Sequence, residues 1–485
     1  MTAIPRISPR LAAFAFATLL VISGTAIWYL HGANDHPTWT HELPGKGVVS
    51  SIAAGLSVDG TELVVVGGYA VKDGTGEDLR LLALESASGH VRWEHRQARG
   101  IAPYMNKEPR IAFDADGHIL AGWQYTAVGR GDEASLEKLS STDGSILWEW
   151  RLNVSGQGAR RPGSGQVALP SAISRDHVWV SGIASKGDQT YDRFLALLES
   201  ATGREKWLVF NNQARDAFAQ PARIFPLGVT DAIVFSPPQK HERSYPWILQ
   251  RVDETNGTEI WRVELTRDNE RSLPDVHCLV DEVGGEVLVF WQEVIGGRWK
   301  GELIRYDADT GLEVARRPSP FPDILSGGVY GAALGEAGEV HLWGRKEIER
   351  THVNWLNWSY DPDLTIPLPE SRTFWHVHPV RLTLSSSDGR VLSENRLSAD
   401  ESPTTVWNDP ATGQPAVMFV RSMRKRAQVE PWRTLRLDGR VGLPTASGPA
   451  SSLHYPAVAA VTPSGRIVTT GDPLEEKLFW SIRLW

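Results

Sequence analysis

The chain repeats one pattern of hydrophobic and polar positions along most of its length. In each copy a run of apolar residues is followed by a polar turn, a glycine and a second apolar run. The first copy is LLALESASGHVRWEHR, which begins at Leu81 and carries Glu85, Gly89 and Trp93 at intervals of four residues. Because no long apolar stripe with a period of 3.6 residues occurs, the pattern predicts β-strands joined in hairpins.

These hairpins recur at a nearly constant spacing. The first five turn glycines are separated by 55, 59, 54 and 54 residues, by subtraction of their numbers. The repeated turn glycines are Gly89, Gly144, Gly203, Gly257, Gly311 and Gly389. The residues four positions after them are Trp93, Trp148, Trp207, Trp261, Ala315 and Ser393. Glycine supplies the positive φ that a tight turn requires, so each copy is predicted to turn at its glycine.

Two further predicted strands precede each hairpin. In the first copy these are SIAAGLSVDG and TELVVVGGYA, which lie just before the stretch at Leu81. Four antiparallel strands in about 50 residues form one blade of a β-propeller. A series of β-sandwich domains is the alternative. Sandwiches do not repeat a Gly-x-x-x-Trp hairpin at one period, so the pattern favours an all-β propeller.

The blades can be counted from these repeats. They are assigned to residues 47–98, 99–153, 165–212, 218–266, 273–317, 322–397 and 398–445. The sixth span is too long for one blade, and its segment RTHVNWLNWSYDPDLTIPLPESRTFWHVHP, which begins at Arg350, is expected to include an extended inter-strand loop.

The tail after the seventh span supplies only three strands, and the fourth is predicted at the other end of the chain. WTHEL, from Trp39 to Leu43, matches the outer strands WEWRL and WRVEL but has no hairpin before it. Residues 38–44 are therefore predicted to complete the last blade beside the C-terminal strand, since this removes the open edges of the ring. Eight blades result, with seven as the alternative.

Two of the repeats resemble a known family. LLALESASGHVRW and LALLESATGREKW resemble the repeat of PQQ-type, quinoprotein-dehydrogenase-like β-propellers, which runs L-x-A-L-D-A-x-T-G-x-x-x-W. The resemblance covers nearly the whole chain after residue 36 and assigns the propeller to residues 38–485. It implies that the repeat tryptophans, and Trp39 with them, are structural residues that stack between neighbouring blades. The chain is most similar to the non-enzymatic, BamB-like branch, which implies a protein–protein interaction scaffold in envelope protein assembly.

The enzymatic branch of that family implies a different function. Its dehydrogenases hold the quinone PQQ against a vicinal disulfide and bind Ca²⁺, whereas Cys278 is the only cysteine of this chain. FDADG (Asp114, Asp116) and YDADTG (Asp307, Asp309) resemble fragments of calcium loops but lack the remaining ligands, so hairpin turns are favoured. We therefore expect no catalytic residue, cofactor or metal. A propeller that binds a quinone or another small ligand, including a PQQ-dependent dehydrogenase, is the alternative.

An uncharged segment precedes the propeller. Residues 11–30, LAAFAFATLLVISGTAIWYL, would span about 30 Å as a helix, which matches the core of a bilayer. Arg6 and Arg10 place residues 1–10 in the cytoplasm, and a linker over 31–37 leads to the propeller in the periplasm. The prediction is a single-pass anchor in the inner membrane. The alternative is a signal peptide cleaved near Gly24-Thr25-Ala26, which would release the propeller to the periplasm.

The sixth span also suggests a surface for a protein partner. The candidate residues are Trp355, Trp358, Trp375, His376 and His378, together with the basic group Arg421, Arg424, Lys425 and Arg426. Tryptophan is enriched at binding hot spots, and loops on a rigid scaffold commonly carry function. The histidine pair can in principle share a metal ion, but no third ligand is identifiable, so a solvated pair is favoured. The net charge of −8 argues against binding of nucleic acid.

Overall fold

The computed structural model describes residues 38–485 with gaps. The undescribed residues are 1–37, 45, 73–75, 102–109, 128–130, 153–166, 169–175, 186–190, 212–221, 228–230, 237–245, 267–274, 296–297, 319–328, 336–338, 354–371, 386–389, 397–400, 409–414, 422–432, 437–440, 443–452, 465, 474–477 and 485. Every regular element in the described part is a β-strand, which confirms the all-β prediction. No helix capable of crossing a membrane was found in that part, and the predicted anchor at 11–30 lies outside it.

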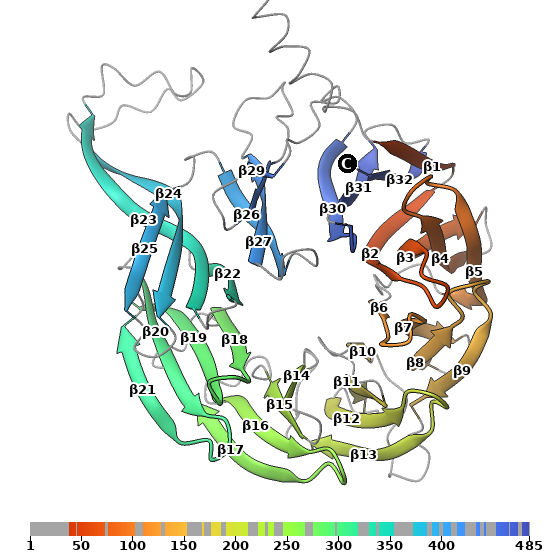
Figure 1. The fold of residues 1–485 in the computed structure, drawn as a ribbon, viewed down its shortest axis with the longest axis horizontal. Coiled ribbons are helices and arrows are strands. Elements are labelled where there is room, and N and C mark those ends of the chain that lie inside the picture. The colour runs from red at the N-terminus through yellow and green to blue at the C-terminus, as the bar shows by residue number, and fades with distance from the viewer. Residues whose placement is uncertain are drawn as a thin grey trace, which may run out of the picture.

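The described strands form eight four-stranded antiparallel sheets, which follow one another around a ring like the blades of a propeller (Figure 1). The first four sheets comprise β2(Lys46–Leu56) β3(Glu62–Lys72) β4(Gly76–Glu85) β5(Val91–Ile101), β6(Arg110–Phe113) β7(Ile119–Ala127) β8(Gly131–Leu139) β9(Ile146–Arg151), β10(Val167–Ala168) β11(His177–Ser185) β12(Tyr191–Glu199) β13(Glu205–Asn211), and β14(Arg223–Leu227) β15(Asp231–Ser236) β16(Trp247–Asp253) β17(Glu259–Leu265).

The other four sheets follow in chain order, except that the last also takes the first strand. They comprise β18(Asp275–Asp281) β19(Glu286–Ile295) β20(Arg298–Asp307) β21(Glu313–Pro318), β22(Val329–Leu334) β23(Glu339–Val353) β24(Arg372–Ser385) β25(Val391–Arg396), β26(Glu401–Asn408) β27(Pro415–Arg421) β28(Arg433–Arg436) β29(Val441–Gly442), and β30(Leu453–Val461) β31(Ile467–Pro473) β32(Leu478–Leu484) with β1(Trp39–Pro44). We number these sheets as blades 1 to 8 in the order given.

The hydrophobic core lies between the blades rather than in one central mass. Alternate residues of a strand point to opposite faces of its sheet, so an apolar strand contacts the blade before it and the blade after it. Val64 and Leu84 of blade 1 pack with Ile482 of blade 8, whereas Val65 and Leu81 pack with blade 2. Burial of both sheet faces explains why the middle strands are nearly continuous apolar runs.

Each repeat tryptophan docks on the turn glycine of the next blade. A Cβ built on Gly203 would lie 2.5 Å from the indole of Trp148, and the other repeats give the same close approach. The docked pairs are Trp39 on Gly89, Trp93 on Gly144, Trp148 on Gly203, Trp207 on Gly257 and Trp261 on Gly311. Each indole N–H also donates a hydrogen bond of 2.7–3.0 Å to a carbonyl three residues before that glycine. These residues are therefore structural.

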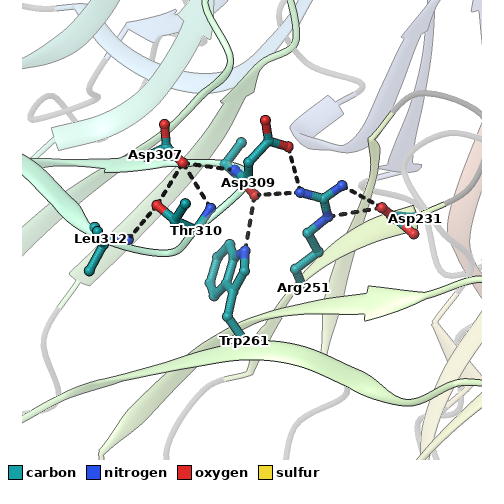
Figure 2. A network of polar contacts seen from close by, with 8 residues as sticks. Asp231, Arg251, Trp261, Asp307, Asp309, Thr310 and Leu312 are labelled. Carbon is teal, nitrogen blue, oxygen red and sulfur yellow. Dashed lines mark hydrogen bonds and ion pairs between the residues drawn. The ribbon is translucent and has the colours of Figure 1, made fainter.

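Polar side chains reinforce these contacts between blades. Arg251 on β16 donates to Asp231 of its own blade and to the Ala308 carbonyl and Asp309 carboxylate in the turn of blade 5 (Figure 2). Trp261 donates to the same Ala308 carbonyl at 3.0 Å. One turn of blade 5 is thus held by a charged group and an indole of blade 4.

The ring closes where the two ends of the propeller meet. Trp39–Pro44, which the sequence places beside the C-terminal strand, pairs antiparallel with β32, and Trp39 is opposite Leu484. Arg466 of blade 8 lies 2.9 Å from Glu62 of blade 1, which also accepts from the Ser464 amide at 2.8 Å. Strand pairing and an ion pair therefore both join the last blade to the first.

The Glu62→Gln variant is expected to weaken this closure in a pH-dependent way. Burial acts to raise the pKa of Glu62, but hydrogen bonds from Ser86, Arg466 and Ser464 lower it below the ordinary value of 4.5. A lowered carboxyl pKa stabilises the fold above that ordinary value, and the contribution is lost as the pH falls through the lowered value. We expect Glu62→Gln to cost about 1 to 3 kcal/mol near neutral pH and less at about pH 3, which lies below the ordinary pKa of the carboxyl.

Denaturant midpoints of wild type and variant at the two pH values check this. Glu94→Gln, which breaks surface pairs with Arg96 and Arg80, is the control and is expected to change the midpoint little. A penalty for Glu62→Gln that is equal at both pH values would contradict the assignment.

The two ends of each blade differ. The first-to-second and third-to-fourth strand turns of a blade lie at the same end, because the strands are antiparallel. Turns of neighbouring blades also contact one another, since the Val58 amide donates to Ser141 and a Cβ on Gly117 would meet the Leu56 carbonyl. We call this side the turn face; its turns are at 57–61, 86–90, 114–118, 140–145, 200–204, 254–258, 282–285 and 308–312. The opposite side, with the second-to-third strand connections, is the loop face.

Candidate interaction site

Blade 6 carries a two-stranded extension that we call the arm. In blade 6, β22 pairs with β23 only at Val340–Gly344, and β25 pairs with β24 only from Val380 onward. β23 and β24 nevertheless remain paired from Arg345 opposite Pro379 to Val353 opposite Arg372. Nine residues of strand span about 30 Å. The arm therefore projects well beyond the four-stranded part of its blade, as Figure 1 shows.

The base of the arm is firmly packed. Trp343 and Val380 are fully buried where the arm begins, and the neighbouring Leu342 and Leu382 join a cluster with Leu288 of blade 5. This apolar contact between two blades fixes the direction in which β23 and β24 leave the ring. The arm is thus a projection from a rigid support, which limits the entropy lost when a partner binds.

A buried histidine also lies at the base. His341 is 3.4 Å from the carboxylate of Glu339 and 3.3 Å from the Thr383 hydroxyl. Burial lowers its pKa, the Glu339 carboxylate opposes that shift, and Arg381 adds to it. The imidazole is therefore held neutral at physiological pH and joins the two strands through polar contacts.

The backbone of the arm offers open edges. Within the described residues no strand pairs with the outer side of β23 over 345–353 or of β24 over 372–379. A row of free N–H and C=O groups on an edge strand is a template for a further strand. The register of β23 shifts between Glu347 and Glu349, whereas β24 is continuous from Arg372 to Pro379. The regular edge is therefore that of β24, since a bulge interrupts pairing.

The composition of the arm differs from that of the whole chain. Its two segments, 345–353 and 372–379, contain four Arg or Lys residues and two Glu residues, for a formal charge of +2. The whole chain carries −8. Three histidines and the aromatic pair Phe374 and Trp375 also fall in these segments. Cationic and aromatic residues on an open strand pair suit an extended, acidic segment of a protein.

The structure gathers some of the predicted partner-binding residues and leaves others undescribed. Trp375, His376 and His378 all lie on β24 in the arm, opposite Arg350, Glu349 and Lys346 of β23 in the same order. Arg421 ends β27 of the neighbouring blade. Trp355, Trp358, Arg424, Lys425 and Arg426 lie outside the described residues.

The extended loop predicted within the segment from Arg350 onward is bounded by two strands. Arg350–Val353 belongs to β23 and Arg372–Pro379 to β24, and residues 354–371 between them lie outside the described part. Strand pairing in the arm extends past the point where the blade's other two strands stop. The signal in the sequence was the β-rich run FWHVHPV, which is typical of a strand rather than a loop.

The two calcium-like fragments are turns. Asp114 accepts from the amides of Asp116 and His118 at 3.0 and 2.8 Å. Asp307 accepts from the Asp309 amide and from Thr310 in the same way (Figure 2). Their carboxylates are therefore used to shape hairpins. In the described part of the chain no three His, Cys, Asp or Glu side chains gather as a metal site.

Comparisons with known proteins give similarities of structure only. No family model matches the chain, and no curated protein matches it. BamB from Moraxella catarrhalis is similar at 11% identity over 79% of this chain and 96% of that one, with a TM-score of 0.39. Quinohemoprotein alcohol dehydrogenase from Comamonas testosteroni is similar at 10% identity over 93% and 76%, with a TM-score of 0.47. The β-propeller domain of the trilobed protease from Pyrococcus furiosus is similar at 11% identity over 83% and 96%, with a TM-score of 0.41. Solved structures similar to this chain thus include BamB and a quinohemoprotein dehydrogenase, the two kinds of protein that the repeat resembles.

Proposed function

We propose that this protein is an eight-bladed, membrane-anchored scaffold that holds a protein partner through the arm of blade 6. The observation that carries the proposal is the arm itself. It is a β-ribbon with open edges, continued from a sheet whose base is buried between two blades. A ring held together by repeated indole contacts supplies rigidity, and the arm supplies an edge for strand addition. Residues 11–30 serve as the anchor, and the propeller works in the periplasm.

The partner is proposed to be a protein with an extended acidic segment. That segment adds a strand to the edge of β24, where its main chain pairs with the residues from Arg372 to His378. Its carboxylates then lie near the cationic residues of the arm, which steers association and fixes register. Envelope protein assembly is a process in which such segments are handled, and we place the function there.

Removal of the arm tests the proposal. The variant joins Arg345 to Pro379 through Asn-Gly, a two-residue hairpin turn, so that the buried base and the rest of the blade remain. We expect the melting temperature to change little, because the residues removed lie beyond the packed core. After crosslinking in membranes that contain the full chain, we expect recovery of partner proteins to fall at least about tenfold, which corresponds to about 1.4 kcal/mol.

A charge reversal gives a matched control. Arg350→Glu with Arg372→Glu reverses two charges in the arm, and Arg96→Glu with Arg151→Glu reverses two exposed charges on outer strands of the ring. Only the first pair should reduce recovery. Equal recovery from wild type and the armless variant would show that the arm does not bind the partner and would reject the proposed function.

A further inference from the structure

We propose that the turn face of the ring lies against the lipid headgroups of the membrane, so that the arm and the loop face point away from it. The inference rests on the proposed anchor at residues 11–30. It assigns opposite roles to the two faces: one contacts lipid, and the other is presented to protein partners. Four features carry it.

The first feature is the place where the N-terminal segment joins the ring. β1 begins at Trp39, which docks on the turn glycine Gly89 and donates to the Ser86 carbonyl at 2.8 Å. The chain therefore enters the propeller at the turn face. Seven residues, 31–37, separate it from the proposed span, and seven extended residues reach at most about 25 Å. A tether of this length holds the turn face close to the bilayer.

The second feature is a band of exposed apolar side chains. These side chains occupy the first three positions after the turn glycine in blades 1, 2, 4, 5 and 6, whereas blade 3 carries Arg204, Glu205 and Lys206 there. The band consists of Val91, Ile146, Leu147, Ile260, Leu312, Val314, Val391 and Leu392. Leu312 has 69% of its surface exposed, and Val283, in another turn of blade 5, is fully exposed. Exposed apolar groups that recur in this way commonly mark a contact surface.

The third feature is the position of that band along the strands. Each member lies at nearly the same distance along its strand from the turn, and the five blades that carry them lie on both sides of blade 3 in the ring. The band therefore follows the circumference of one face rather than a single patch. A flat surface that meets several blades together fits this arrangement, and a bilayer is such a surface.

The fourth feature is the charge of the turns, which selects the lipid. Three carboxyls at the turns, those of Asp143, Asp253 and Asp307, accept hydrogen bonds that lower their pKa values. The donors are Ser145, Thr255 and Thr310 in the same order. These groups stay ionised at neutral pH and make the turn face acidic. Anionic lipids would repel such a face. The expected surface is one of zwitterionic headgroups.

The arm leaves from the other end of its sheet. β23 begins at Glu339 on the turn-face side and runs to Val353 at the far end of the arm. β24 returns from Arg372, so the far end of the arm lies on the loop-face side of its blade. A ring that lies with its turn face on lipid would therefore present the arm to the periplasm.

Fluorescence quenching in nanodiscs tests the orientation on the full chain. Two single variants, Leu312→Cys and Pro318→Cys, each carry a thiol-reactive fluorophore. The two labelled positions lie at opposite ends of the outer strand of blade 5, about 20 Å apart along the strand. Both positions are exposed. Cys278 is the only native cysteine, and burial raises the pKa of its thiol to about 12, so it should stay unlabelled in the folded protein. Phosphatidylcholine with a nitroxide-bearing lipid supplies the quencher.

We expect quenching at position 312 to be several-fold stronger than at 318, and to weaken when phosphatidylglycerol replaces part of the phosphatidylcholine. Equal quenching at the two positions, or stronger quenching at 318, would overturn the proposed orientation. Stronger quenching at 312 in the anionic lipid would contradict the charge argument. If the armless variant still loses its partner while the two labels are quenched equally, the orientation alone is rejected. If 312 is selectively quenched but the armless variant keeps its partner, the proposed function alone is rejected.

Discussion

Replacement of Gly203 by alanine is expected to lower the free energy of unfolding by about 2 to 5 kcal/mol, although it adds one methyl group. Gly203 has a φ of +69°, which costs an L-residue about 1 to 2 kcal/mol. The new Cβ would also lie 2.5 Å from the indole of Trp148, which is buried between blades 2 and 3. The indole must shift, and overpacking of this kind costs about 1 to 3 kcal/mol.

Gly60→Ala separates the two contributions. Gly60 has a φ of +80°, but a Cβ built there meets nothing within 4 Å. It should therefore show the conformational cost alone, about 1 to 2 kcal/mol. Denaturant unfolding of both variants gives the difference, which measures the contact between Trp148 and the turn. If the two substitutions lower the free energy of unfolding equally, docking of the Trp148 indole does not require glycine at position 203.

Deletion of Trp39–Pro44 is expected to open the ring. β1 supplies the fourth strand of blade 8, and its indole contacts blade 1, so the deletion removes a strand and an interblade contact together. Loss of the tryptophan alone is expected to cost about 3 to 5 kcal/mol. The deletion also leaves β32 as an edge strand. We expect a much lower denaturant midpoint and early proteolytic cleavage within β30 to β32.

Two single substitutions in β1 show which residue is responsible for the loss of stability. Trp39→Ala should produce a large part of the loss, because the indole donates to the Ser86 carbonyl and fills the junction. Thr40 is exposed, and Thr40→Ala should leave both the midpoint and the proteolysis unchanged. A deletion variant as stable as the wild type would show that β1 does not close the ring.

Most of the fold could be predicted from local patterns in the sequence. Turn glycine and tryptophan lie four residues apart, so both the hairpin and its docking residue can be recognised from a short stretch such as the one at Leu81. The partial copy at Trp39 likewise gave its strand partner, because an outer strand without a hairpin needs a neighbour from elsewhere. These features depend on residues close together along the chain.

Contacts between distant residues were not predictable in this way. Arg251 meets Asp309 58 positions later, and Glu62 meets Arg466 404 positions later. Nothing near Arg251 or Glu62 in the sequence marks those partners. The length of the arm could not be predicted for the same reason, because it depends on the register between segments separated by residues 354–371. The run FWHVHPV indicates a strand that carries Trp375 and His376, but it does not identify the strand with which it pairs.

The closure between Glu62 and Ser464 constrains how the protein is made. The two residues are separated by 402 positions, and β1 must wait for β32. At ~5 to 20 residues per second, a ribosome needs roughly 20 to 90 s to pass from one strand to the other. During that interval blade 8 lacks β30, β31 and β32, and the edge of β1 that will later pair with β32 is exposed. A nascent chain is thus exposed to aggregation until β32 (Leu478–Leu484) emerges, and a chain that stops before Leu478 would remain in that unclosed state.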